Sequence, residues 1–266
     1  MIERGRRLRA RIARPVLIGL MIVLAVLIVI ETIELFGIIG HEKTIGGDLR
    51  YYRFVAERWL ETGVYYTPDQ LSAPFVVRAL VHNLYPPHAL YLFIPFVYLP
   101  DALWWGVPFV IVGYVVWWCR PTLSGWLLLV VIMALPKTVA QLIVGNTDMW
   151  VTCVVAGAVR WSWPGVLMSF KPSLAFLAAI GVRSRSWWIA LLALGLVSVP
   201  LWSLWFDYSV VVRNSSADLS YSLGNLPFFL LPIAAWLMSS RRGDASLWHW
   251  MRQLLGRDRR AEGPAA

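Results

Sequence analysis

Polar residues are scarce in this sequence, and the densest group is the stretch Gly46-Gly47-Asp48-Leu49-Arg50-Tyr51-Tyr52, which follows the first long apolar run. A carboxylate beside a low-dielectric wall has a raised pKa and accepts a proton more readily, so Asp48 could be a general base. The alternative is a helix N-cap, because Asp before a helix binds its free N–H groups, and spacing alone favours it. Arg50 and Arg53 could clamp a phosphate or could lie among lipid headgroups.

Lys171 is the other charged group that could do chemistry, because it lies inside an apolar run. A buried amine is costly unless it meets an anion. A substrate phosphate would serve as that anion, and so would a structural carboxylate such as Asp148. The residues that could bind substrate are polar groups expected at the outer membrane surface or inside the helical bundle: Tyr52, Tyr85, His88, Asn146 and Asp148.

The sequence contains no motif that indicates a metal or a cofactor. It has no Walker loop, no dinucleotide glycine pattern and no Gly-x-Ser-x-Gly elbow. Its four histidines have no metal-ligand spacing. Cys119 and Cys153 lie inside apolar runs and are expected to be small buried residues. We therefore expect neither a metal nor a cofactor.

The composition indicates an integral membrane protein. Of the 266 residues, 59% are hydrophobic and 15% are charged, against about 25% charged residues in soluble domains. The 16 tryptophans suit a membrane–water boundary. The net charge of +9 comes mostly from arginines at the ends of apolar runs, which fits anionic lipid and the positive-inside bias. They form no clustered basic face, so we expect no nucleic-acid partner.

The two ends of the chain are basic and are expected in the cytoplasm: residues 1–15 and residues 241–266. The apolar run 16–39 can cross a hydrocarbon core of about 30 Å and is interpreted as an uncleaved anchor. Glu31 and Glu34 lie on one face near its outer end, where they either snorkel or line a cavity with Asp48. A single transmembrane domain, residues 16–240, would follow the basic N-terminus.

Two segments are expected outside the cytoplasm. The first outer loop, residues 40–87, contains a pattern over 49–62 that predicts an amphipathic helix on the outer leaflet, ending at Gly63. A second short helix is expected over residues 75–84. The second outer loop comprises residues 206–226.

The remaining pattern predicts an all-α membrane bundle of roughly seven to nine helices, some of them short or re-entrant. Residues 88–99 are apolar but too short to cross alone. Lys171-Pro172 splits 164–181 into two half-helices with Lys171 at the apex. The expected crossing segments are 102–119, 124–144, 149–159, 187–205 and 227–237. In this topology the arginines of the inner loops lie beside the N-terminus: Arg120, Arg160, Arg183, Arg185, Arg241 and Arg242.

Several motifs, in their order, resemble glycosyltransferase family 87, the polyprenyl-phosphate-mannose-dependent α-mannosyltransferases of the GT-C superfamily. The first is Asp48-Leu49-Arg50-Tyr51-Tyr52, followed by Ala56, Gly63 and Tyr66. The others are Tyr85-Pro86-Pro87 through Pro95 to Leu99-Pro100, then Gly145-Asn146-Thr147-Asp148, then Gly165 to Lys171-Pro172. Asn146 and Asp148 stand where the family has Gln and Asn. The chain is also shorter than typical members of the family, and we expect it to lack several of their C-terminal helices.

The resemblance implies a GT-C-like fold in the cell membrane. It further implies transfer of a hexose, with mannose the first candidate, from a polyprenyl-phosphate donor to an extracytoplasmic glycolipid or polysaccharide. Asp48 would activate the acceptor hydroxyl, and Lys171 with an arginine would stabilise the leaving phosphate. This hypothesis requires Asp48 and Lys171 to share one outward-opening pocket. Two other functions stay open: a non-catalytic lipid-binding or assembly subunit, and a small transporter or flippase with a midplane site.

Overall fold

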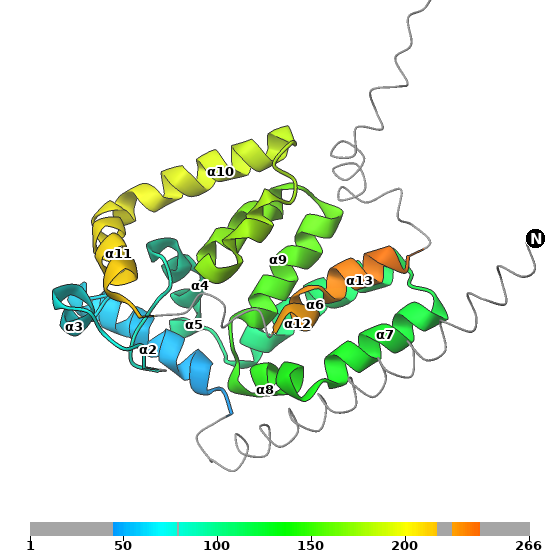
Figure 1. Ribbon diagram of the computed structural model, residues 1–266, viewed down its shortest axis with the longest axis horizontal. Coiled ribbons are helices and arrows are strands. Elements are labelled where there is room, and N and C mark those ends of the chain that lie inside the picture. Colours follow the sequence, from blue (N-terminus) through cyan, green and yellow to red (C-terminus); the bar gives the residue numbers. More distant parts are fainter. Residues whose placement is uncertain (1–44, 79, 217–224, 240–266) are drawn as a thin grey trace, which may run out of the picture.

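The computed structural model describes residues 45–78, 80–216 and 225–239. Within these ranges the protein is helical, and its β contacts are isolated bridges only (Figure 1). The predicted anchor at 16–39 with its two glutamates, and the basic ends 1–15 and 241–266, lie outside the described residues.

Two helices in the described part are long and apolar enough to cross a membrane. One is α6 (Ala102–Cys119), whose bounds are those expected from the sequence. The other spans Arg185–Asn214 and consists of α10 (Arg185–Ser198), the short 3-10 helix η4 (Val199–Leu201) and α11 (Trp202–Asn214). The described chain is thus all-helical with two candidate membrane-spanning helices.

The segment 124–144, expected to be one crossing helix, is broken in the structure. Helix α7 (Leu123–Ala134) and helix α8 (Pro136–Val144) meet at an angle of 60°. Leu135 has an extended ψ of 129°, because a proline ring disfavours the helical conformation at the residue before it. The two helices form either a broken span or a re-entrant loop.

The helix predicted over 49–62 is confirmed as α2 (Gly47–Thr62), while its place on the outer leaflet stays a prediction. Gly63 ends it in the left-handed region, with φ 72°, and its N–H binds Trp59 O. The buried side chains of α2 are Leu49, Tyr52, Val55 and Ala56. They pack into the protein core, so the apolar face of α2 covers other helices.

The structure differs from two predictions about the outer segments. The described residues of 75–84 form no helix: the short helix of this loop is α3 (Pro68–Ser72), before that segment, and the backbone of Phe75 pairs with the segment after α11. These long-range hydrogen bonds outweigh the local helical pattern. In the expected second outer loop, residues 206–214 are helical and belong to α11, because Leu204 and Val211 keep the helical spacing and are buried; the place of this loop outside the membrane stays a prediction. Residues 217–224 lie outside the described part.

Helix α9 (Asp148–Arg160) lies at the centre and packs against α6, α12 (Leu226–Phe229) and α13 (Leu231–Leu237) (Figure 1). The expected inward segments 149–159 and 227–237 therefore form helices, the second of them in two pieces. Both cysteines are free and buried, as expected.

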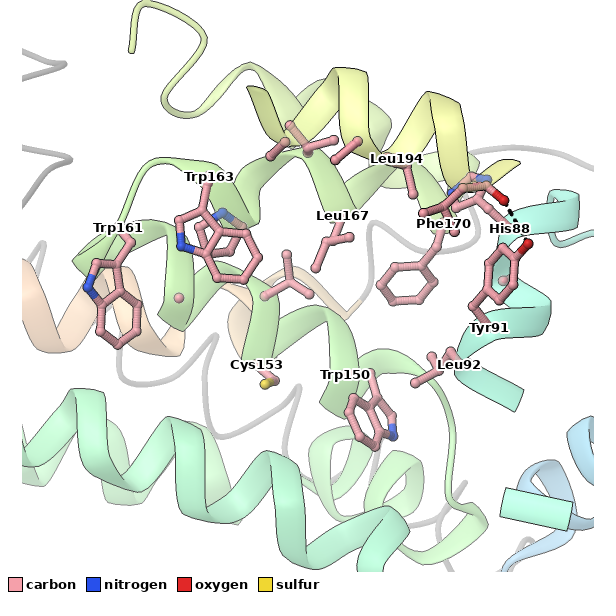
Figure 2. A pocket seen from close by; sticks show the side chains of 18 of the residues that line it. His88, Tyr91, Leu92, Trp150, Cys153, Trp161, Trp163, Leu167, Phe170 and Leu194 are labelled. Carbon is pink, nitrogen blue, oxygen red and sulfur yellow. Dashed lines mark hydrogen bonds between the residues drawn. The ribbon is translucent and has the colours of Figure 1, made fainter. Parts of the chain in front are cut away.

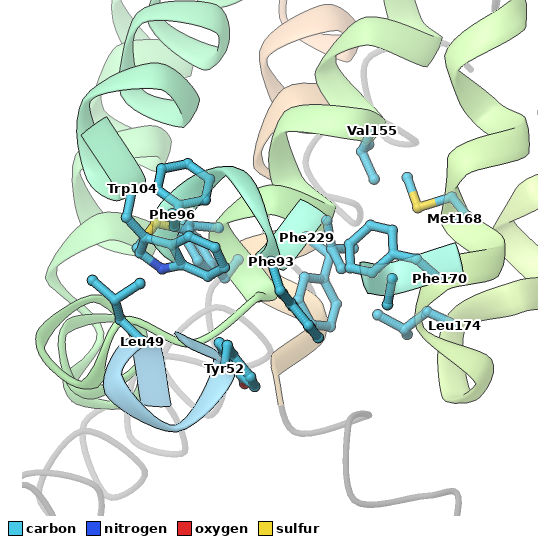
Figure 3. Close-up of a cluster of buried hydrophobic side chains, with 14 of the residues drawn as sticks. Leu49, Tyr52, Phe93, Phe96, Trp104, Val155, Met168, Phe170, Leu174 and Phe229 are labelled. Atoms are coloured by element: carbon cyan, nitrogen blue, oxygen red, sulfur yellow. The ribbon is translucent and has the colours of Figure 1, made fainter. Parts of the chain in front are cut away.

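The short apolar segment 88–99 connects α2 to the rest of the core. It forms the 3-10 turn η1 (Pro87–Ala89), α4 (Leu90–Phe93) and α5 (Pro95–Tyr98). Figure 3 shows Tyr52 beside Phe93, whose ring stacks on it with centroids 4.8 Å apart. The same cluster includes Trp104 of α6 and Phe170, so one core joins the first loop to the helices.

The break at Lys171 is confirmed, and it separates two limbs of a hairpin. The limbs are the 3-10 helices η2 (Trp163–Phe170) and η3 (Pro172–Ala179), with Lys171 extended between them. The limbs pack closely against one another. Gly165 makes this approach possible, because a Cβ there would lie 2.4 Å from Ile180 O.

Gly165→Ala is expected to lower the free energy of unfolding by about 1–3 kcal/mol, because the added methyl group overlaps a backbone oxygen. Gly195→Ala is the matched control, since a Cβ there meets no atom within 4 Å. Thermal unfolding of the purified protein in detergent compares the two. Equal melting temperatures for both variants would show that the limbs are not closely packed at Gly165.

Helices α6 and α9 run parallel, in the same direction, and define two ends of the molecule. At one end Trp104 Nε1 donates to Gly145 O, and at the other the Arg160 guanidinium lies over the Trp118 ring. At about 1.5 Å per residue α6 is about 27 Å long, close to the thickness of a hydrocarbon core. The ends of α6 and α9 and the start of α10 lie on one side (Figure 1), which gathers the arginines there: Arg120, Arg160, Arg183 and Arg185.

Candidate functional site

Asp48 lies in the first turn of α2 and faces the turn between α8 and α9. Its Oδ2 accepts a hydrogen bond of 2.5 Å from Asn146 Nδ2. The N-cap position belongs to Gly46, which has a φ of 65° and makes no side-chain cap hydrogen bond. The N-cap interpretation of Asp48, which spacing alone favoured, is therefore wrong.

The α8–α9 turn is the centre of the site. Its Gly145 is left-handed, with φ 72°, and its carbonyl is held by Trp104 at 2.8 Å. Asn146 Oδ1 accepts from the backbone N–H of Asp148 at 3.1 Å, while its Nδ2 donates to Asp48. One amide side chain thus joins the first-loop acid to the start of α9.

Asp148 is fully buried and binds Lys171 at the apex of the hairpin. Lys171 Nζ donates to Asp148 Oδ1, and Asn225 Nδ2 donates to Asp148 Oδ2 at 2.6 Å. The Lys171 side chain is 2% exposed. The anion that Lys171 meets in the structure is therefore the structural carboxylate, one of the two alternatives that the sequence left open.

Burial and neighbouring groups shift the pKa of the Asp48 carboxyl. Burial is the largest effect and raises the pKa of the Asp48 carboxyl above its usual value. The Asn146 hydrogen bond lowers this pKa, the charge of Asp148 raises it, and the charge of Lys171 lowers it. Asp48 remains partly exposed. A carboxylate in this position can take a proton from a hydroxyl that reaches it.

A chain of hydroxyl groups extends the network to the first loop. Tyr52 Oη lies 3.2 Å from Tyr85 Oη, which lies 2.6 Å from Thr147 Oγ1. Thr147 Oγ1 in turn donates to Asn146 Oδ1 at 3.4 Å. Tyr52 is buried, so its hydroxyl supports the network from inside the core.

The two predicted phosphate-clamping arginines bind elsewhere. Arg53 pairs with Asp101 at 2.6 Å on the surface, and Arg50 donates to Ile45 O at 2.6 Å. Each of these contacts is exposed. Among the described residues these contacts lie on the surface, and the role of the two arginines in phosphate binding stays a prediction.

His88 is also separate from the network. Its Nε2 lies 3.2 Å from Ser169 Oγ, and its ring stacks on Trp205 with centroids 5.5 Å apart. Ser169 Oγ donates to Val166 O, so it accepts from the His88 ring. His88 thus ties the hairpin to α11.

Two residues of the network were missed by sequence reasoning. Thr147 stands inside the Gly-Asn-Thr-Asp turn, and its place between two polar residues was a usable signal. Asn225 follows the second outer loop with no motif around it, and only the folded chain brings it to Asp148.

Two cavities meet at His88 and Leu194, between the hairpin and the α10–α11 span. One has a volume of about 730 Å³, and its lining includes Ser169, Pro172 and aromatic rings of α11. The other, of about 690 Å³, is almost wholly apolar (Figure 2). Asp48 and Lys171 line neither of them, so these two cavities do not supply the shared outward-opening pocket that was expected from the sequence. Asp48 and Lys171 are connected instead through the side chains of Asn146 and Asp148.

The chain matches no protein-family model, no curated protein and no solved structure, so its resemblance to glycosyltransferase family 87 stays a prediction carried by the motifs and their geometry.

Proposed function

We propose that the protein is a membrane glycosyltransferase. It moves a hexose, with mannose the first candidate, from polyprenyl phosphate to a glycolipid or polysaccharide outside the cytoplasm. One observation carries the proposal: residues from all of the resembling motifs converge in one hydrogen-bonded network. Its members are Asp48, Tyr52, Tyr85, Asn146, Thr147, Asp148 and Lys171.

In the proposed reaction Asp48 removes the proton of the acceptor hydroxyl as that oxygen bonds to C1 of the donor sugar. The bond between C1 and the phosphate oxygen breaks on the opposite face, and polyprenyl phosphate leaves with the electron pair. Positive groups stabilise the charge that develops on the phosphate. Arg50, exposed on the same helix, is a candidate for this role. The main role of Lys171 is structural, because it binds Asp148 and so holds the turn that carries Asn146.

The cavity of about 730 Å³ supports a lipid-linked donor. Its lining includes Ser169 and Pro172, which lie two residues before and one residue after Lys171 in the sequence. It also includes Pro86, which follows Tyr85. Its other walls come from the candidate membrane-spanning segment α10–α11. A lipid could therefore enter it sideways from the bilayer while its headgroup stays near the network.

The proposed orientation places the arginine end in the cytoplasm and the Asp48 network outside, with both termini cytoplasmic. The support is that the two groups occupy opposite ends of α6 and α9. In a protein without Cys119 and Cys153, Glu61→Cys is expected to react with a membrane-impermeant maleimide in intact cells. Ser124→Cys, at the arginine end, should react only after lysis. The reverse pattern would contradict the orientation.

The test of the function uses the purified protein in liposomes. We expect transfer of labelled mannose from polyprenyl-phosphate mannose to an alkyl mannoside, with release of polyprenyl phosphate. A nucleotide-linked mannose should give no product. Failure to transfer from polyprenyl-phosphate mannose or glucose to alkyl glycosides and extracted membrane glycolipids would contradict the proposal.

A second candidate is a non-catalytic lipid-binding or assembly subunit of the same architecture. It is favoured by the pairing of Lys171 with Asp148, and by the cavity linings, which include neither Asp48 nor Lys171. Such a protein would bind polyprenyl-phosphate mannose without turnover. Binding and transfer measured on the same preparation separate the two candidates.

A further inference from the structure

Arg160, the last residue of α9, holds its guanidinium between two indole rings. Its Cζ is 4.7 Å from the ring centre of Trp118 and 5.4 Å from that of Trp161. Its Nε is buried without a hydrogen-bond partner. The contacts found for this side chain in the described part of the protein are these two rings. A guanidinium offers five N–H donors in a fixed plane, so Arg160 is positioned for an acceptor from outside the chain.

The apolar cavity reaches Trp161, one of the two rings that contact this guanidinium. Trp161, which contacts Arg160, lines one end of the cavity together with Gly157 and Pro164. Figure 2 shows Trp161 and Trp163 at this end and Tyr91 with His88 at the other. The volume of about 690 Å³ is within the range of small-molecule sites. The long apolar cavity therefore ends at a ring that carries a positive charge beside it.

A candidate membrane-spanning segment borders this space. One wall is formed by Ala190, Leu194 and Val197 of α10, which belongs to the candidate membrane-spanning segment Arg185–Asn214. Neighbouring side chains of α10 are exposed and apolar, among them Ile189 and Leu192. If α10 spans the bilayer, lipid chains lie next to this wall of the cavity.

We propose that the cavity binds a chain of an anionic phospholipid whose phosphate lies against the Arg160 guanidinium. Arginine recognises phosphate with two parallel hydrogen bonds, and the indole rings hold the guanidinium in place. Arg183 and Arg185 lie at the same end of the molecule and attract anionic lipid to it. This end is opposite to Asp48, so the phosphate position is distinct from that of the proposed donor, although the two cavities share His88 and Leu194, and the proposal does not depend on sugar transfer.

The test uses the full-length protein, delipidated in detergent and titrated with dioleoylphosphatidylglycerol or dioleoylphosphatidylcholine. These lipids have the same chains and differ in headgroup charge. Native mass spectrometry counts the bound lipid. We expect phosphatidylglycerol to bind about 10- to 100-fold more tightly than phosphatidylcholine. Both phosphates can accept charge-assisted hydrogen bonds from Arg160, but the choline cation of phosphatidylcholine competes with Arg160 for the phosphate.

Two variants separate the headgroup from the chain. Arg160→Gln should remove the preference for phosphatidylglycerol, whereas Arg120→Gln, at the same end but without ring contacts, should keep it. Ala190→Phe fills the cavity and should weaken both lipids. Equal binding of the two lipids by the wild type would overturn the proposal. So would an unchanged preference in Arg160→Gln, or phosphatidylglycerol binding that Ala190→Phe leaves intact. Because Ala190→Phe leaves Arg160 in place, it tests the site even if Arg160→Gln does not fold.

Discussion

Asp48→Asn is expected to slow sugar transfer by about 100- to 10,000-fold, the usual contribution of a general base. An asparagine has almost the same shape, and its oxygen can still accept the hydrogen bond from Asn146. What it cannot do is take a proton from the acceptor hydroxyl. The measurement is the initial rate of transfer from polyprenyl-phosphate mannose in liposomes.

The same variant should not be less stable than the wild type. Burial raises the folded-state pKa of Asp48, so the ionised carboxylate destabilises the folded protein at neutral pH. Asparagine removes that cost, and thermal unfolding should show an equal or higher melting temperature. Asp69→Asn, at an exposed acid paired with His82, is the control and should keep full transfer. A stable Asp48→Asn protein with unchanged transfer would exclude Asp48 as the base.

Lys171→Met is expected to lower the free energy of unfolding by about 3–5 kcal/mol, because it leaves the buried Asp148 carboxylate without its cation. Asn225 would still donate to that carboxylate, but an amide cannot neutralise it. Chemical denaturation of the purified protein in detergent measures the loss. A loss below about 1 kcal/mol would show that the Lys171–Asp148 pair is not a buried ion pair.

The double variant Lys171→Met with Asp148→Asn separates structure from chemistry. Removing both charges should recover most of the stability, because replacing a buried ion pair by neutral groups is often nearly neutral. If Lys171 also acts on the donor phosphate, the double variant will fold and still lack transfer. If Lys171 only holds the turn, transfer will return with stability.

The parts of the fold that the sequence predicts well have local causes. Helix α6 has the expected bounds, and α2 ends at Gly63 because only glycine adopts φ 72° there without strain. The break at Lys171 follows from Pro172, which removes a backbone donor and disfavours helix before it. In each case the decisive residue is adjacent to the feature.

The errors have long-range causes. Phe75 bonds to the segment after α11, which no local pattern reveals. Asp48 has the residue type of an N-cap, but the left-handed Gly46 takes the N-cap position two residues earlier. The Asp48 side chain therefore binds Asn146 instead of the helix end. Asn225 could not be foreseen as a partner of Asp148, since the contact exists only after α12 packs against α9.

The pH dependence of transfer by the wild-type protein tests most directly whether Asp48 is the base. Its carboxyl must be ionised to accept a proton, and its pKa is raised above the usual Asp value of about 3.9. We predict that the transfer rate falls as pH decreases through this raised pKa, at a higher pH than an ordinary aspartate would give. The residual rate of Asp48→Asn should lack this step. A wild-type rate that stays constant across the acidic range, or the same step in Asp48→Asn, would contradict the account.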